Sequence, residues 1–130
     1  MLAHEINESL MDLVFLGIDY GIDNLRDFNQ LMAFVLVEFE EERTLHRFPS
    51  ERFEESYKQG KDFLQTIENF DYAVLVYDGT FTLEEKCDAV LADGRIKGEP
   101  FIYEFAQIYK PKKLFSKVKP IGNVGFVGRN

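Results

Sequence analysis

Four carboxylates in the second half of the chain have the residue types and spacing best suited to chemistry: Asp78, Asp88, Asp93 and Glu104. They lie within or at the ends of apolar segments. Two or three convergent carboxylates hold a Mg²⁺ or Mn²⁺ ion, and one of them can serve as a general base. Glu104 and Asp88 are therefore the catalytic candidates, for a metal-dependent hydrolase. Asp78 and Asp93 each precede a glycine, which is typical of turns.

Glu104 is the only charged residue of segment 101–109, where Tyr103 and Phe105 flank it. Burial would raise the pKa of this carboxyl and suit it to act as an acid. The competing interpretation is an ion pair with a lysine of the basic C-terminal segment. We favour the ion pair, because structural pairs also perturb carboxylates and the sequence contains no complete catalytic set.

Histidine and cysteine add little to these candidates. His4 and His46 have no metal-ligand spacing around them, and Cys87 begins an apolar run that is typical of a buried thiol. We expect no metal site and no cofactor. A single cysteine excludes an internal disulfide and indicates a reducing compartment, so we expect a cytoplasmic protein.

Charge is distributed unevenly along the 130 residues, whose net charge is −8. Residues 1–104 carry 23 acidic and nine basic side chains, a net −14, whereas residues 105–130 carry six basic and no acidic ones, a net +6. Nucleic-acid binding requires a surplus of Lys and Arg, so we expect no nucleic-acid partner. No apolar run approaches the ~18–20 residues of a membrane span, and we expect no membrane association. The basic segment is expected to fold against the acidic body of its own chain or of a neighbouring copy.

Two glutamate-rich stretches are candidate contact surfaces for a protein partner. The first contains Glu40, Glu41 and Glu42, and the second contains Glu54 and Glu55. Like-signed runs are usually solvated faces, but they also suit docking to a basic protein. The sequence therefore favours a small non-catalytic binding or regulatory module over the hydrolase.

The first half of the chain mixes helical and strand patterns. Apolar residues at helical spacing predict a helix over residues 4–16. Two glycines and two aspartates predict a loop over 17–24, followed by a short helical turn at 25–29. Residues 31–39 fit a helical stripe as well as a buried strand, and we favour the strand. Segment 43–48 is its possible hairpin partner, although the intervening glutamates are not usual turn residues.

The second half begins with a helix and continues with strands. A proline and the capping Ser50 predict a helix over about residues 50–69. Asp78-Gly79 and Asp93-Gly94 are typical hairpin turns and are expected to end strands. Five apolar segments predict strands at 72–77, 87–92, 101–109, 114–118 and 121–127. The expected fold is one α+β domain over residues 1–130, with N-terminal helices and the central helix on a mainly antiparallel sheet formed largely by residues 72–127.

One strand pairing can be worked out in detail. Placing Ala92 opposite Phe101 closes the loop 93–100 and puts Asp88 and Glu104 on opposite faces of the sheet. Both faces are then largely apolar, so each needs a cover. The helices would cover one face, and the other would meet the remaining helical segments or a second copy of the protein. Homodimerisation is therefore the expected form of self-association.

Overall fold

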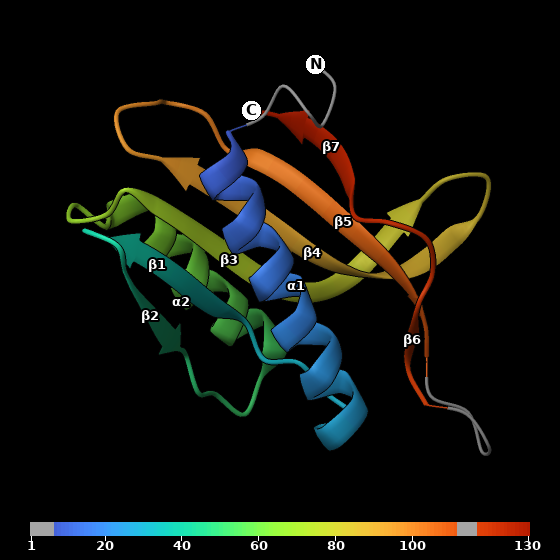
Figure 1. Ribbon diagram of the computed structural model, residues 1–130. Helices are drawn as coiled ribbons and strands as arrows, with labels where there is room; N and C mark the ends of the chain where they lie inside the picture. The colour runs from blue at the N-terminus through green and yellow to red at the C-terminus, as the bar shows by residue number, and fades with distance from the viewer. Residues whose placement is uncertain (1–6, 112–116) are drawn as a thin grey trace.

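The computed structural model describes residues 7–111 and 117–130. Two helices pack against a seven-stranded antiparallel sheet, which confirms the predicted α+β class (Figure 1). The helices are α1 (Glu8–Phe28) and α2 (Phe53–Thr66). The strands are β1 (Phe34–Phe39), β2 (Glu42–Arg47), β3 (Tyr72–Thr82), β4 (Lys86–Ile96), β5 (Tyr103–Lys110), β6 (Lys119–Pro120) and β7 (Gly125–Arg129). Their order in the sheet is β2-β1-β3-β4-β5-β6, and β7 also pairs with β5.

The two helices lie on opposite faces of the sheet and divide the core in two. α1 packs on β3, β4 and β1, whereas α2 packs on β1 and β3. The larger cluster, on the α1 side, includes Leu13, Phe34 and Phe105, and the smaller one, on the α2 side, includes Leu64 and Leu75. This arrangement explains why the strands are apolar on both faces, as the sequence indicated. No helix within the described ranges is long and apolar enough to cross a bilayer.

Helix α1 continues through the segment that the sequence predicts to be a loop. Its cap is Asn7, whose side chain accepts a hydrogen bond from the Leu10 amide, and Asn29 ends it with a φ of 61°. Residues 17–24 are helical because Gly17 and Gly21 lie against the sheet, where a Cβ would stand 2.8 Å and 3.0 Å from valine methyl groups. The loop prediction is therefore wrong: these glycines provide close packing. The start of the predicted helix, residues 4–6, lies outside the described residues.

The strand interpretation of segment 31–39 is confirmed for residues 34–39, and β1 and β2 form the predicted hairpin. The turn between them consists of Glu40 and Glu41, whose φ angles are 51° and 68°. Two successive left-handed residues are typical of the two-residue hairpin turn, which ordinarily contains Asn and Gly. The Glu40 amide donates a hydrogen bond to the Asp71 carboxylate at 2.9 Å, and this contact fixes the turn against β3.

Helix α2 is shorter than the sequence predicts. It begins at Phe53, and Ser50 is not its cap: the Ser50 hydroxyl accepts from the Arg52 amide and donates to Glu55. Gly60 faces β3, where a Cβ would be 2.7 Å from a Leu75 methyl group. A glycine that costs helix propensity thus lets the helix approach the sheet.

Strands β3 and β4 run straight through both Asp-Gly dipeptides, so the turns predicted there are wrong. Gly79 lies in β3, where an added Cβ would be 2.8 Å from the Leu91 side chain. Gly94 lies in β4, where an added Cβ would be 2.9 Å from the side chain of Leu10 in α1. Both glycines leave room for a leucine side chain. The turns that reverse the chain lie outside the two Asp-Gly dipeptides. The β3–β4 turn falls at Leu83–Glu85, and the next connection contains Gly98 at a φ of 82°.

The β4–β5 register differs from the expected one by four residues, because Ala92 lies opposite Phe105 and not Phe101. An even shift leaves every side chain on its predicted face. The C-terminal segment folds against its own chain: Val118 is buried in the α1-side core, and its carbonyl accepts a hydrogen bond from Arg26 at 2.9 Å. Most of the predicted strand 114–118, together with Lys112 and Lys113, lies outside the described residues.

Candidate functional site

The two catalytic candidates do not belong to one site. Asp88 lies on the face of the sheet that α1 covers, and Glu104 lies on the face that α2 covers. Each has a different carboxylate neighbour, which is Asp78 for Asp88 and Asp93 for Glu104. The face assignment made from the sequence is confirmed, and a metal site shared by the two candidates is not formed.

Asp93 and Glu104 form the more buried of the two carboxylate pairs. They are direct partners on β4 and β5, and Tyr77 of β3 donates a hydrogen bond to Asp93 at 3.3 Å. Burial and, secondarily, the Glu104 charge raise the pKa of Asp93 to about 6, against the opposing effects of Tyr77 and Lys61. Burial also raises the pKa of Tyr77. Glu104 accepts a hydrogen bond from the Asn130 amide group, and among the described residues it forms no ion pair with a lysine of the basic segment.

These side chains border a hollow of about 270 Å³ between α2 and the strands. Tyr57 and Lys61 of α2 form its other wall, and the Tyr57 and Tyr77 rings are 4.7 Å apart. A carboxyl that titrates near neutrality suits proton transfer or the binding of a small cation. Among the described residues, however, no three His, Cys, Asp or Glu side chains converge as a metal site would require.

The second pair, Asp78 and Asp88, lies on the α1 side of the sheet. The Tyr109 hydroxyl donates to Asp78 at 2.8 Å, and Asp88 is exposed opposite Thr80. Burial raises the pKa of Asp78, and the Tyr109 hydrogen bond partly offsets this shift. Asp78 therefore lies within a strand, where Tyr109 contacts its carboxylate, and not at the turn that the following glycine predicts.

The candidate binding glutamates are dispersed. Glu40 and Glu41 form the β1–β2 turn, and Glu42 begins β2. Glu54 and Glu55 lie in the first turn of α2, at the opposite end of the hairpin. The 14 residues of α2 separate the two groups by roughly 20 Å at 1.5 Å per residue. They are therefore two small acidic patches, not one acidic face.

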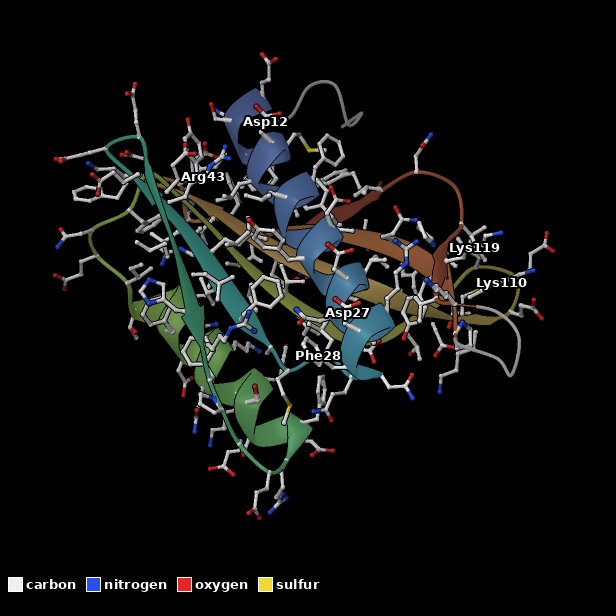
Figure 2. All side chains as sticks on the ribbon, turned by 60° about the horizontal axis from the view of Figure 1, so that its bottom comes forward. Asp12, Asp27, Phe28, Arg43, Lys110 and Lys119 are labelled. Carbon is white, nitrogen blue, oxygen red and sulfur yellow. The ribbon has the colours of Figure 1, made fainter. Side chains whose placement is uncertain are left out.

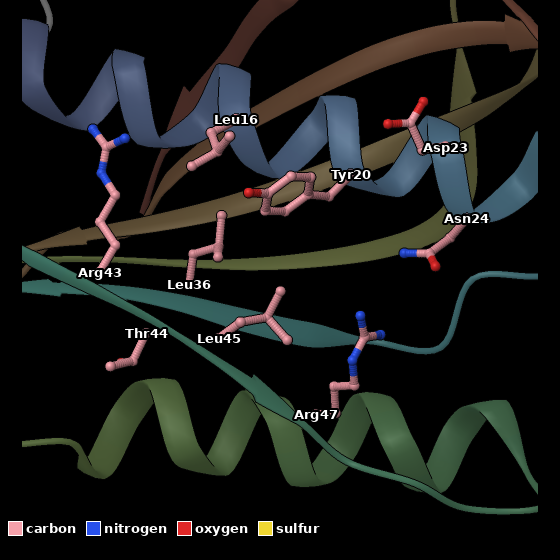
Figure 3. Close-up of a pocket in the computed structure, with 9 residues that line it drawn as sticks. All are labelled: Leu16, Tyr20, Asp23, Asn24, Leu36, Arg43, Thr44, Leu45 and Arg47. Atoms are coloured by element: carbon pink, nitrogen blue, oxygen red, sulfur yellow. The ribbon is translucent and has the colours of Figure 1, made fainter.

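A groove runs between α1 and the edge strand β2, with a volume of about 530 Å³ (Figure 3). Leu16, Leu36 and Leu45 form its apolar part, and Tyr20 of α1 lies over them. Two arginines of β2 stand at its ends. We call this site the α1–β2 groove, and the residues that line it are Leu16, Tyr20, Asp23, Asn24, Leu36, Arg43, Thr44, Leu45 and Arg47.

A second hollow, of about 330 Å³, lies on the α2 side of the sheet but beyond α2 itself, which packs on β1 and β3. Exposed apolar side chains surround it: Leu83 is 63% exposed, Ile121 45% and Val127 41%. We call this surface the apolar face, which consists of Phe81, Leu83, Ile108, Ile121 and Val127. Single exposed apolar residues are ordinary, but such a gathering indicates an interaction surface.

Comparison with known proteins finds no matching family model, no matching curated protein and no matching solved structure. The function is therefore inferred from the geometry of these surfaces.

Sequence reasoning missed both the α1–β2 groove and the pairing of Asp93 with Glu104. The glycine that follows Asp93 predicts a turn there, whereas the structure places Asp93 within β4. The alternation of Arg43, Leu45 and Arg47 was the available signal for the groove, since residues two apart in a strand share a face. The expectation that the helices share one face of the sheet is wrong, because each face carries one helix, and the apolar face is the part of the α2 side that α2 does not cover.

Proposed function

We propose that this chain is a non-catalytic protein–protein interaction module that acts through the apolar face, with a second copy of the chain as its partner. The observation that carries the proposal is the exposure of Leu83, Ile121 and Val127 around one hollow. Burying such side chains against another protein is the main source of binding free energy at interfaces. C2 pairing is the commonest way for identical chains to cover a shared apolar surface.

Charge supports pairing with a second copy. Glu84 and Glu85 follow Leu83 in the β3–β4 turn, whereas Lys110 and Lys119 are neighbours on β5 and β6 (Figure 2). Both charged groups border the apolar face, because its Leu83 directly precedes the glutamates and its Ile108 lies two residues before Lys110. A two-fold axis through this face lets the acidic turn of one copy face the lysines of the other, which favours association of two chains that are each net negative.

Sedimentation equilibrium at micromolar concentrations tests this function. We expect a dimer for the unmodified chain and a monomer for Ile121→Asp, because a carboxylate in the interface would be desolvated. Phe28→Asp is the matched control, since Phe28 is 69% exposed at the end of α1, outside the apolar face. A monomeric unmodified chain at high micromolar concentration, or a dimer that survives Ile121→Asp, would contradict the proposal.

The metal-dependent hydrolase is the second candidate, and the titration of Asp93 near neutrality beside Glu104 favours it. In this version Asp93 takes the place of Asp88 in the carboxylate pair. Thermal melting with Mg²⁺, Mn²⁺ and Ca²⁺ tests it. A rise of several degrees that Glu104→Gln removes would support the hydrolase, and unchanged melting with all three ions would contradict it.

A further inference from the structure

Strand β2 forms an edge of the sheet, and no strand among residues 7–111 and 117–130 pairs with its outer side. The direction of its backbone groups follows from its neighbour. The Glu38 carbonyl accepts a hydrogen bond from the Asp71 amide at 2.8 Å, so the backbone of Glu38 is directed toward β3. Its partner on β2, Arg43, therefore lies in a non-hydrogen-bonded pair and directs its own N–H and C=O outward. Because backbone direction alternates with a period of two residues, Leu45 and Arg47 also direct their N–H and C=O groups outward.

The same three residues present their side chains to the α1–β2 groove. Leu45 is opposite Leu36, which belongs to the α1-side core, so the alternating residues Arg43, Leu45 and Arg47 share that face. Backbone donors and acceptors at the free edge thus coincide with an apolar side chain between two cations. The groove volume of about 530 Å³ lies within the usual range of ligand sites.

The charges in this groove select the sign of the occupant. Arg43 forms an ion pair with Glu38 at 2.8 Å, while Arg47 has no such pair within the described part of the chain. Figure 3 shows Asn24 on the α1 side nearest Arg47, with the Asp23 carboxylate turned away. An acidic side chain is therefore favoured beside Arg47.

We propose that the free edge of β2 binds an extended peptide as an additional antiparallel strand, in which residues opposite Arg47, Leu45 and Arg43 are acidic, apolar and acidic. Main-chain hydrogen bonds supply affinity in this mode, and the alternate side chains supply specificity. A second copy of β2 fits poorly: pairing centred on Leu45 places Arg43 of each copy opposite the other's Arg47. This surface is separate from the apolar face, so the inference does not depend on the proposed function.

The probe is a fluorescein-labelled heptapeptide, Thr-Glu-Thr-Leu-Thr-Glu-Thr, titrated against the full chain and followed by fluorescence anisotropy. We expect saturable binding, with amide shift changes and slower hydrogen exchange at Arg43, Leu45 and Arg47. A peptide with both glutamates replaced by lysine should bind about tenfold more weakly, because both cross-strand charge pairs change sign. Methylating the leucine nitrogen should abolish binding, because that amide points toward β2.

Protein variants complete the test. Arg47→Glu should weaken the acidic peptide about tenfold, whereas Lys58→Glu makes the same change in net charge on the exposed side of α2 and should leave affinity unchanged. If Arg47→Glu lowers the melting temperature of the protein, Arg47→Gln takes its place. The proposal is overturned if no peptide binds at millimolar concentration, if Arg47→Glu and Arg47→Gln bind like the unmodified chain, or if the N-methylated peptide keeps its affinity.

Discussion

Asp93 on β4 and Glu104 on β5 stand directly opposite each other, two acids in a position where opposite charges are favoured. Burial and the neighbouring Glu104 charge disfavour ionisation of Asp93, and the hydrogen bond from Tyr77 and the charge of Lys61 offset only part of this effect. The pKa of Asp93 therefore rises from its ordinary value of 3.8 to about 6. Ionisation of Asp93 at neutral pH therefore opposes folding.

Because the folded protein holds this proton more tightly, the stabilisation from Asp93 is complete below about pH 4 and is lost as pH rises through 6. We predict that Asp93→Asn raises the free energy of unfolding near pH 8 by up to about 3 kcal/mol, the value of a two-unit shift. The gain should shrink toward pH 4. Urea denaturation at three pH values measures it, with the exposed Asp12→Asn as control. A difference that does not vary with pH would contradict this origin.

The sequence was informative where periodicity alone determines structure. The α+β class and the placement of Asp88 and Glu104 on opposite faces follow from the spacing of apolar residues, whereas the β1–β2 hairpin does not, because segment 31–39 also fits a helical stripe. The face assignment held even though the β4–β5 register shifted by four residues, because side chains alternate with a period of two.

Glycine positions were misread because their role depends on distant residues. Local propensity predicts a loop at Gly17 and turns at Gly79 and Gly94, yet each glycine leaves room for a side chain of another element. Such close approaches depend on tertiary packing that a single sequence does not reveal. The same errors hid the Asp93–Glu104 pair, because Asp93 was placed in a turn.

Gly17 offers a direct test of this packing role. On helix propensity alone, Gly17→Ala would stabilise α1 by about 1 kcal/mol. The added Cβ would lie 2.8 Å from a Val76 methyl group and 3.3 Å from Leu36, so we predict destabilisation of about 1–3 kcal/mol. Chemical denaturation measures the change, and Asp19→Ala at an exposed position of α1 is the control. A more stable Gly17→Ala variant would show that the sheet moves aside without cost.

Gln107 is a buried polar residue that connects β5 to the C-terminal segment. It is 5% exposed, and its amide nitrogen donates to the carbonyls of Ile108, Ile121 and Gly122 at 3.0, 3.0 and 3.3 Å. Gln107→Leu removes this donor from the Ile121 and Gly122 carbonyls, whereas the Ile108 carbonyl keeps the Ile121 amide as its donor, and we predict a loss of about 1–3 kcal/mol. Hydrogen exchange should quicken across residues 117–130, including Ile121 of the apolar face. The exposed Gln59→Leu is the matched control, and unchanged exchange in Gln107→Leu would refute this anchoring role.

The β1–β2 turn carries a cost that one substitution can remove. Glu41 has a φ of 68°, a left-handed conformation that costs a non-glycine residue roughly 1–2 kcal/mol, whereas glycine adopts it freely. Glu41→Gly should therefore stabilise the protein by about 1 kcal/mol. The neighbouring Glu42→Gly is the matched control: it removes the same charge within β2 and should destabilise by about 0.5–1 kcal/mol. Denaturation midpoints of the two variants should move in opposite directions, and a shift of both in the same direction would assign the effect to charge and not to backbone conformation.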